Sequence, residues 1–302
     1  MKVFLTGITG FVGAQVARVL VGANHDVLGL IRRDSSLWRL EGITDKIQFV
    51  EGDFYAIDSY QQALVEWKPD ACIHLAWYAE PGKYLHSPLN LSALTASLSL
   101  LQKLIDIGCG QIVMAGTCAE YDTERGFLTE EGPTKPSTIY AATKLSMALI
   151  GQQMANAAGV NFVWGRLFYM YGPYEDERRV IPALIRALLA GRQFPASAGE
   201  QVRDYLHVED VANALILLTE KQVNGIYNIA SGRPISIRQL MENIGEITGR
   251  SDLIKFGDIA YRVWDPMFIC GDNQRLRSLG WRPQYSLKNG LSRTINWLNQ
   301  RI

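Results

Sequence analysis

The amino-acid sequence predicts an α/β fold in which a doubly wound parallel sheet is joined to a smaller, interleaved C-terminal lobe. Three observations lead to this prediction. Short runs of mainly apolar residues alternate with longer helical stretches through the first half of the chain. A glycine-rich turn directly follows the first of these runs. The regular alternation ends after Gly165, where loops and separate helical stretches follow.

Short runs in the first half have the length and composition of buried strands. Their near-continuous apolarity is typical of strands covered on both faces, and the segments between them are long enough for crossover helices. We therefore expect them to pair in parallel. The predicted strands are residues 2–6, 26–31, 47–52, 71–76, 111–116 and 161–167.

The second half has its own start and stop signals. A helical pattern over 180–191 ends at Gly191, and residues 225–230 have the composition of one more strand. Ser236 with Gln239 three residues later is the pattern of a capping box at a helix start. We assign residues 1–167 and 203–231 to the sheet domain, and residues 168–202 and 232–302 to the second lobe.

Composition and charge favour a small-molecule substrate. Of the 302 residues, 48% are hydrophobic, and 30 basic residues balance 30 acidic ones. No net field therefore attracts nucleic acid or an anionic membrane. The apolar stretch at the N-terminus is too short for a signal peptide, and no run of about 18 apolar residues occurs elsewhere. We expect a cytoplasmic protein.

The cysteines and histidines have no metal-binding spacing. The chain has four of each, with no CxxC pair. We therefore expect neither a metal site nor a disulfide framework.

The stretch "LTGITGFVG" contains a phosphate-binding pattern. Gly7, Gly10 and Gly13 follow the first strand and open a helical run, so the backbone can approach a diphosphate at a helix N-terminus. This position in an alternating α/β chain indicates a dinucleotide-binding Rossmann domain. The predicted contacts in this turn are Gly7, Thr9, Gly10, Phe11, Val12 and Gly13.

The end of the second predicted strand favours NADP. NAD-selective proteins usually place a carboxylate there, but this chain has Ile31 followed by Arg32 and Arg33. A guanidinium at this place can pair with a 2′-phosphate. Asp34 leaves NAD possible, since its carboxylate can reach a ribose. Asp53, at the end of the third strand, is a candidate for contacting the adenine.

"STIYAATK" places Tyr140 and Lys144 one helical turn apart and therefore on one face. An isolated YxxxK pattern is common by chance. Here the pair follows the fifth strand, whose end carries Thr117, in a chain that already has a dinucleotide loop.

With these residues the chain resembles the extended short-chain dehydrogenase/reductases of the nucleotide-sugar epimerase/dehydratase group. The matching segments run nearly end to end and in order: "TGITGFVG", "EGDF", "HLAWYAEP", "AGTCAEY", "YAATK", "GRLFYMYGP", "QVRDYLHVEDVANAL", "YNIASG" and "LGWRP". Such a series is specific for the superfamily and much less specific for the substrate.

The resemblance assigns Thr117, Tyr140 and Lys144 to catalysis. Tyr140 would exchange a proton with a sugar oxygen if its pKa fell by about three units, which needs about 4 kcal/mol. One ammonium at about 4 Å and an effective dielectric constant of about 20 supplies that much, so Lys144 is a sufficient cause at this distance. Thr117 would orient the reacting oxygen.

Further site residues are implied by the same resemblance. Phe54, Leu75 and Ala76 join the cofactor contacts, and Tyr140 and Lys144 also contact the nicotinamide end. Arg203 would neutralise the diphosphate of a nucleoside-diphosphate sugar. The other predicted substrate contacts are Trp77, Tyr78, Glu80, Cys118, Tyr169 and Arg179, with Cys118 as a packing residue rather than an acid. Arg166 is expected to be structural, with a buried carboxylate partner.

The sugar chemistry is left with two alternatives. Dehydratases of this group carry Thr-Asp-Glu where this chain has Thr117, Cys118 and Ala119, so 4,6-dehydration is rejected. Arg32 and Arg33 favour NADPH-dependent reduction of the 4-keto group of a nucleoside-diphosphate 4-keto-(di)deoxyhexose. The alternative is an NAD-dependent nucleotide-sugar 4-epimerase. A dinucleotide sensor without catalysis is disfavoured by the intact catalytic set.

A homodimer is the expected assembly. Apolar residues at alternating spacings of three and four form a seam on one predicted helix, and the family commonly dimerises through it and the helix of Tyr140. Packing of the seam on the chain's own sheet is the alternative. The seam consists of Leu91, Leu94, Leu98, Leu101 and Ile105.

Overall fold

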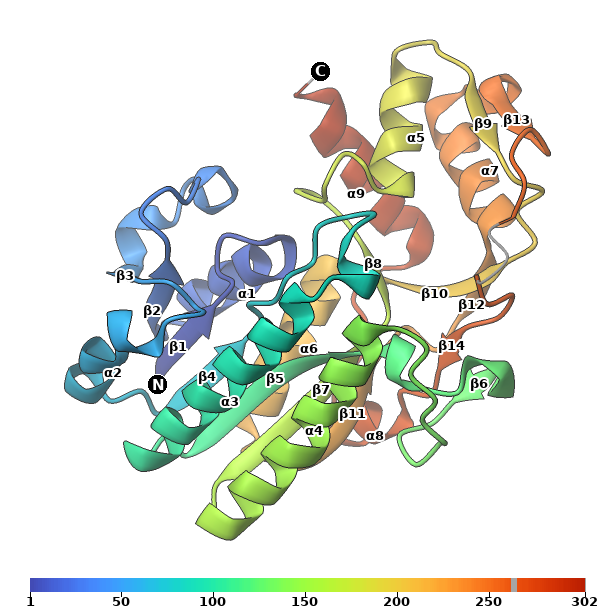
Figure 1. Ribbon diagram of the computed structural model, residues 1–302. Coiled ribbons are helices and arrows are strands. Elements are labelled where there is room, and N and C mark those ends of the chain that lie inside the picture. The colour runs from blue at the N-terminus through green and yellow to red at the C-terminus, as the bar shows by residue number, and fades with distance from the viewer. Residues whose placement is uncertain (262–264, 302) are drawn as a thin grey trace.

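The computed structural model describes residues 1–261 and 265–301 and contains a parallel sheet of seven strands in the order β11-β7-β5-β4-β1-β2-β3 (Figure 1). Every neighbouring pair in this sheet is parallel. The predicted doubly wound α/β fold is confirmed. The strands are β1 (Lys2–Thr6), β2 (Asp26–Ile31), β3 (Gln48–Glu51), β4 (Ala71–His74), β5 (Gln111–Thr117), β7 (Asn161–Leu167) and β11 (Gly225–Ile229).

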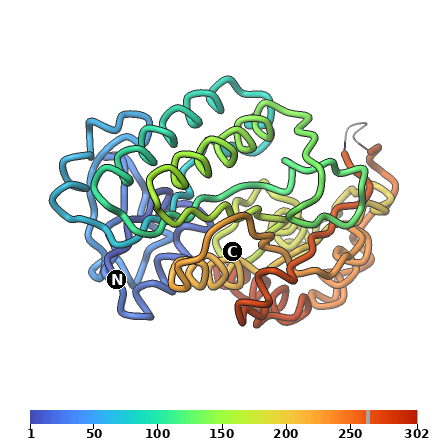
Figure 2. The backbone as a smooth tube through the Cα atoms, turned by 90° about the horizontal axis from the view of Figure 1, so that it is seen from below, coloured from blue at the N-terminus to red at the C-terminus, as the bar shows by residue number. Residues whose placement is uncertain are grey.

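Helices cover both faces of this sheet, as Figures 1 and 2 show. One layer holds α2 (Gln61–Trp67), α3 (Leu89–Asp106) and α4 (Ile139–Ala158), and the other holds α1 (Phe11–Gly22) and α6 (Val208–Glu220). Alternating side chains of strand β1 pack against the helices on the two faces of the sheet. Val3 and Leu5 belong to the core on the α1 side, and Phe4 between them belongs to the core on the α3 side.

The second lobe has a separate core. Buried side chains of α5 (Val180–Leu189), α7 (Ile237–Thr248) and α9 (Leu287–Asn299) pack together, among them Leu184, Leu240 and Leu291. The capping box predicted at Ser236 and Gln239 is confirmed at the start of α7. The remaining elements are β6 (Phe127–Leu128), β8 (Tyr169–Tyr171), β9 (Phe194–Ala196), β10 (Val202–His207), β12 (Pro234–Ser236), β13 (Ile254–Phe256), β14 (Cys270–Gly271) and α8 (Gln274–Ser278).

Strand β10 links the two parts of the chain. It pairs with β8 in parallel and with β12 in antiparallel orientation, forming a sheet of three strands beside the large one. Helix α6 follows β10 directly and packs on α1 under the large sheet. The chain therefore passes from the small sheet into the large domain at His207.

None of the helices in the described ranges 1–261 and 265–301 combines the length and apolarity needed to cross a membrane.

The glycine turn between β1 and α1 is closely packed. Gly7 has φ of +70°, and the Gly10 N–H donates to the Gly7 carbonyl over 2.9 Å. A Cβ atom on Gly7 would lie 2.8 Å from the Ala76 nitrogen, and a Cβ atom on Gly13 would lie 2.0 Å from the Gly7 oxygen. Backbone thus approaches backbone at distances that no side chain permits.

Replacing Gly13 with Ala should destabilise the protein by about 3 kcal/mol, because the new methyl group has no space without a shift of the turn. The matched control is Gly22→Ala at the end of the same helix, where a Cβ atom would meet nothing within 4 Å. That change should be neutral or stabilise by up to about 1 kcal/mol. Urea unfolding of both variants measures the difference, and equal effects would contradict this account of the turn.

Candidate active site

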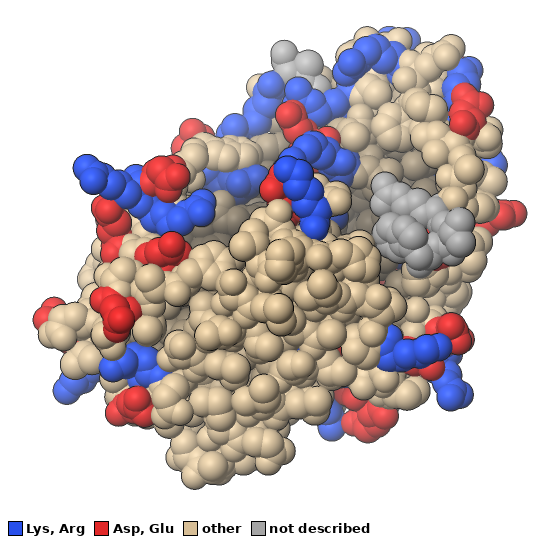
Figure 3. Space-filling model, viewed as in Figure 1, with Lys and Arg blue, Asp and Glu red and all other residues tan. Residues whose placement is uncertain are grey.

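The predicted site residues gather where the parallel strands of the large sheet end and the second lobe begins. The glycine turn follows β1, the 75–80 segment follows β4, and Thr117 ends β5. Carboxyl ends of parallel strands meet at one edge of a sheet, so these segments converge there. Figure 3 shows the surface hollowed between the largely uncharged lower half of this face and the upper lobe, with charged side chains along the rim.

The glycine turn has the geometry of a diphosphate cradle. Phe11 and Val12 lie in the first turn of α1, which carries no acidic side chain. The N–H groups of Leu75 and Ala76 each donate to Thr6 Oγ1 over 3.2 Å, which fixes the segment after β4 against the turn. A dinucleotide diphosphate fits this cradle, because the glycine backbone leaves room for it and the helix N-terminus favours its charge.

The residues predicted to contact the adenosine end lie on the surface beside the ends of β2 and β3. Arg32 and Arg33 are exposed, and the Arg32 guanidinium lies 3.7 Å from the Asp34 carboxylate. Asp53 accepts a hydrogen bond from the Tyr55 N–H over 3.0 Å, and Phe54 is buried. An exposed pair such as Arg32 with Asp34 contributes little by itself and leaves both groups accessible to a ligand.

Tyr140, in the first turn of α4, lies near Thr117 at the end of β5. Thr117 is the main influence that lowers the pKa of the Tyr140 phenol. The ring of Tyr84 meets the ring of Tyr140 edge-on, with centroids 4.8 Å apart. The Thr138 side chain caps α4 by accepting from the Ala141 N–H. The threonine and the phenol therefore lie close together at the carboxyl end of β5.

Lys144 lies one turn further along α4 and is buried. Its Nζ donates to the Ala115 carbonyl over 2.7 Å and lies 3.8 Å from the centre of the Trp77 ring. Burial lowers the pKa of Lys144 to about 7, and Glu120 opposes this shift. The ammonium thus faces the protein interior rather than the phenol.

This geometry differs from the predicted electrostatic effect of Lys144 on Tyr140. Burial raises the pKa of Tyr140 above its ordinary value, and Tyr84 raises it further. The expectation assumed an ammonium at about 4 Å and neglected the cost of burying a phenolate. In the conformation described, the phenol stays protonated at neutral pH.

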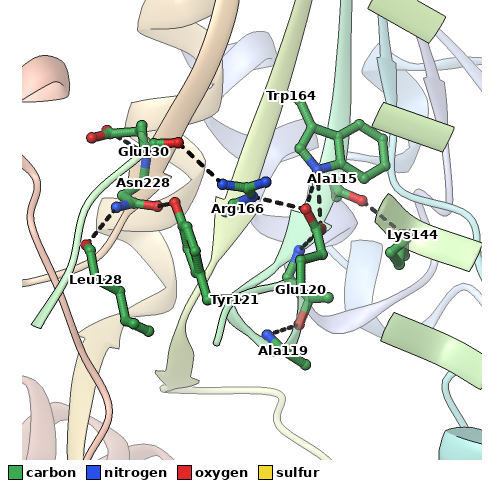
Figure 4. Close-up of polar contacts among 11 residues, drawn as sticks. Ala115, Ala119, Glu120, Tyr121, Leu128, Glu130, Lys144, Trp164, Arg166 and Asn228 are labelled. Carbon is green, nitrogen blue, oxygen red and sulfur yellow. Dashed lines mark hydrogen bonds and ion pairs between the residues drawn. The ribbon is translucent and has the colours of Figure 1, made fainter. Parts of the chain in front are cut away.

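Glu120, which the sequence analysis did not select, organises this region. It is fully buried and accepts hydrogen bonds from the Thr117 N–H at 2.8 Å, from Trp164 Nε1 at 3.0 Å and from Arg166 Nε at 2.7 Å (Figure 4). Arg166 thus has the buried carboxylate partner that was predicted for it. A sequence signal existed, because Thr117 and Glu120 form a capping box across a short turn.

Replacing Glu120 with Gln should destabilise the protein by about 3 to 5 kcal/mol, because Arg166 would keep its charge in the interior without a carboxylate. The control is Glu124→Gln, since Glu124 pairs with Lys135 at the surface. That change should cost less than about 1 kcal/mol. Chemical denaturation distinguishes the two, and a small effect at Glu120 would show that the pair is not a stabilising constraint.

Arg203, predicted to neutralise a diphosphate, is already paired. The side chain is buried, and its Nη2 lies 2.6 Å from Asp265. Asp204 and Glu209, which are closer to Arg203 in the sequence, do not form this pair. The Asp204 carboxylate instead accepts from the N–H groups of Ser231 and Gly232. The Arg203 guanidinium also lies 5.3 Å from the centre of the Tyr169 ring.

The 77–80 segment is held by side-chain hydrogen bonds. Trp77 Nε1 donates to Asn90 over 2.9 Å, and the Tyr78 hydroxyl donates to Glu80 over 3.2 Å. Glu80 also lies 2.9 Å from Lys83. The segment therefore places the Trp77 ring against Lys144, and the Glu80 carboxylate is paired with Tyr78 and Lys83.

Two further predicted substrate contacts have different surroundings. Cys118 is buried in a small apolar cluster with Phe168 and Ile269, and burial raises the pKa of its thiol to about 12. It has the environment of a packing residue. Arg179 precedes α5 and is exposed, with its guanidinium 5.9 Å from the centre of the Tyr84 ring.

Comparison with known proteins identifies the family. Residues 3–230 match the model of the NAD dependent epimerase/dehydratase family. The chain belongs to this family. The resemblance to extended short-chain dehydrogenase/reductases is thereby confirmed.

Members of the epimerase/dehydratase family match this chain over nearly its whole length. A UDP-glucose 4-epimerase of Corynebacterium glutamicum is 29% identical, with 95% of this chain and 92% of that protein covered. The structure of a UDP-N-acetylglucosamine 4-epimerase from Methanobrevibacter ruminantium is 26% identical, with a TM-score of 0.90 over 100% of this chain and 99% of that one. A dTDP-glucose 4,6-dehydratase from Streptomyces venezuelae, solved with NAD bound, is 26% identical with a TM-score of 0.87 over 99% and 97%.

These family members correct the predicted function. The predicted NADPH-dependent reduction of a 4-ketosugar is wrong, because several relatives are named as 4-epimerases of UDP-sugars and the comparisons give no support for a ketosugar reductase. The prediction relied on Arg32 and Arg33. Both arginines are exposed, Arg32 lies beside Asp34, and the structural neighbour from Streptomyces venezuelae was solved with NAD.

Proposed function

We propose that the protein is an NAD-dependent 4-epimerase of a UDP-hexose. The observation that carries this proposal is the placement of Tyr140 near Thr117, with Lys144 one turn further along α4, at the edge of the sheet where the glycine turn lies. The names of the relatives support a 4-epimerase, and the neighbour solved with NAD supports NAD as the cofactor. The NADP preference predicted from the two arginines has no such support.

In this proposal Tyr140 takes the proton from the C4 hydroxyl of the hexose as the hydride leaves C4, and it returns a proton to the same oxygen when the hydride comes back to the other face of C4. Bound NAD supplies the acceptor and donor of the hydride. Thr117 holds the sugar oxygen in line with the phenol. Lys144 is the nearby cation that can stabilise the phenolate if its Nζ turns from the Ala115 carbonyl toward Tyr140.

Dehydration is a weaker candidate although a dehydratase is among the structural neighbours. Elimination of water needs an acid and a base near Thr117, but Cys118 and Ala119 supply neither. Glu120, the nearest carboxylate in sequence, is fully buried and bonded to Arg166 and Trp164. It is thus engaged in the structure rather than presented to a substrate.

The lobe of residues 168–202 and 232–302 is proposed to bind the nucleotide sugar, with the other residues holding the dinucleotide. Arg203 stays a candidate for the diphosphate, in which case the phosphate oxygens would replace or share the Asp265 contact. All four cysteines are free thiols. This suits the proposed location in the reducing cytoplasm.

The proposed reaction is tested by incubating the protein with UDP-glucose and following UDP-galactose by chromatography. Conversion should proceed without net formation of NADH, and the nucleotide released from denatured protein should be NAD. Tyr140→Phe should lower the rate by about 10² to 10⁴-fold. The control Tyr227→Phe, on β11, should leave it unchanged.

Stoichiometric NADPH consumption, or an active Tyr140→Phe variant, would contradict the proposal. Unchanged NAD content in the Phe variant separates loss of proton transfer from loss of cofactor binding.

We further propose that the protein forms a dimer through α3 and α4. Helix α4 has no exposed charged residue along its length, and Leu149 and Ile150 are exposed on it. Of the predicted seam on α3, Leu101 is buried in the chain's own core while Leu91 is 57% exposed. Figure 3 shows a broad uncharged area on the face where Figure 1 places these helices. An apolar area of this kind is typical of an interface.

Leu149→Glu should convert the dimer to a monomer, because the new carboxylate would be buried without a partner. Phe127→Glu is the control, since Phe127 is also exposed but lies on β6, away from α3 and α4. Light scattering coupled to size-exclusion chromatography gives the mass of each variant. A wild-type monomer, or a dimeric Leu149→Glu variant, would refute this interface.

A further inference from the structure

Glu175 occupies the loop between β8 and α5, on the substrate side of the molecule. Tyr174 before it adopts φ of +73°, and its ring packs against Trp38 and Trp297 on the outer side. The Glu175 carboxyl group lies near Arg179, which lowers its pKa, and near Tyr205, whose pKa it raises. The left-handed conformation of Tyr174 thus directs its own ring to the outer side, away from the Glu175 carboxyl group.

The Glu175 carboxyl group has an unsatisfied oxygen. Its Oε2 atom is buried and has no hydrogen-bond partner in the part of the chain that the structure describes. Within those same residues no ion pair involves Glu175, whereas Asp176 beside it is paired with Arg178 at 2.7 Å. A buried oxygen without a partner is costly in a folded protein and calls for a ligand or another explanation.

A first series of contacts leads from Glu175 to the reacting groups. Arg179 is the cation that acts on Glu175, and its guanidinium lies over the ring of Tyr84. The ring of Tyr84 in turn meets that of Tyr140 at 4.8 Å. Glu175 is therefore two residues removed from the proposed proton-transferring phenol along this side.

A second series of side chains also runs from Glu175 to Tyr140. The ring of Tyr205 lies 5.7 Å from that of Tyr169, and both are buried enough to raise their pKa values. Cys118 acts electrostatically on Tyr169 and on Tyr140. Two separate series of side chains thus run from Glu175 to Tyr140. A hexose bound with its C4 oxygen at Tyr140 would extend toward Glu175.

The ionisation of Glu175 suits a neutral partner. Burial raises its pKa to about 8, Arg179 opposes this shift, and Asp176 adds to it. Tyr205 is the titratable group that faces it from β10. At neutral pH the group is thus mainly a carboxylic acid, which both donates and accepts one hydrogen bond. A sugar hydroxyl has the same double capacity and is its natural complement.

We propose that Glu175 is a specificity-determining residue whose free oxygen hydrogen-bonds a hydroxyl group of the hexose remote from C4. This inference rests on the proposed function, because it names the part of the UDP-hexose that the second lobe recognises. It goes beyond the roles proposed for Thr117, Tyr140 and Lys144, and it gives the buried Oε2 atom of Glu175 a hydrogen-bond partner.

The test compares Glu175→Ala, Glu175→Gln and the control Glu177→Ala, whose carboxylate is exposed in the same loop. With UDP-glucose, the Ala variant should lose about tenfold in kcat/KM, mainly through KM. The Gln variant should stay within about threefold, because an amide also donates and accepts. Glu177→Ala should equal the wild type. The Kd for UDP alone should be the same in all four proteins.

Deoxy analogues of UDP-glucose then identify the hydroxyl. For one analogue the wild type and Glu175→Ala should become equal, since the partner is absent in both cases. Equal kcat/KM of Glu175→Ala and Glu177→Ala on UDP-glucose would overturn the inference alone. An equally large loss in the Gln variant would also overturn it, because a charge rather than a hydrogen bond would be required. A wild type that neither binds nor converts UDP-glucose, UDP-galactose, UDP-N-acetylglucosamine or UDP-glucuronate would overturn the proposed function and the inference with it.

Discussion

The buried ion pair between Glu120 and Arg166 is the constraint on which the candidate site depends. Arg166 belongs to β7 and Glu120 to the turn after β5, so the pair joins neighbouring strands at their carboxyl ends. The same carboxylate binds the Thr117 N–H and the Trp164 indole. The position of Thr117, and through it the contact with Tyr140, is thus determined by a charge that never reaches solvent. Removing either partner would leave the other charge in the interior without compensation, so the pair constrains this part of the fold.

The sequence was sufficient for the fold because its signals are local and agree with one another. Apolar runs such as 2–6 and 111–116, each followed by a turn and a helical pattern, leave few topologies besides a doubly wound sheet. The glycine turn was equally readable, since Gly7 and Gly13 occupy positions where any side chain meets backbone. Arg166 was recognised as structural because a buried guanidinium requires a partner.

The ion pairs and hydrogen bonds within the site could not be predicted, because they join residues far apart in the sequence. Arg203 binds Asp265, 62 residues away, rather than the adjacent Asp204. Lys144 donates to the Ala115 carbonyl, a partner that no pattern of side chains discloses. The expected lowering of the Tyr140 pKa was wrong for a related reason. The spacing of Tyr140 and Lys144 in the sequence predicts only that they lie on one face of the helix. The burial that raises the pKa of the phenol depends on Tyr84 and on the rest of the fold.

Arg39 connects the loop between β8 and α5 with the glycine turn of the large sheet. Its Nε donates to the Tyr174 carbonyl over 2.9 Å, and its Nη1 donates to the Thr9 carbonyl over 3.4 Å. One guanidinium therefore bridges the loop that carries Glu175 and the turn that would hold a diphosphate. A displacement of that loop must stretch this bridge or pull on the glycine turn. The loop that carries Glu175 and the turn after β1 are thereby held at a fixed separation by one side chain.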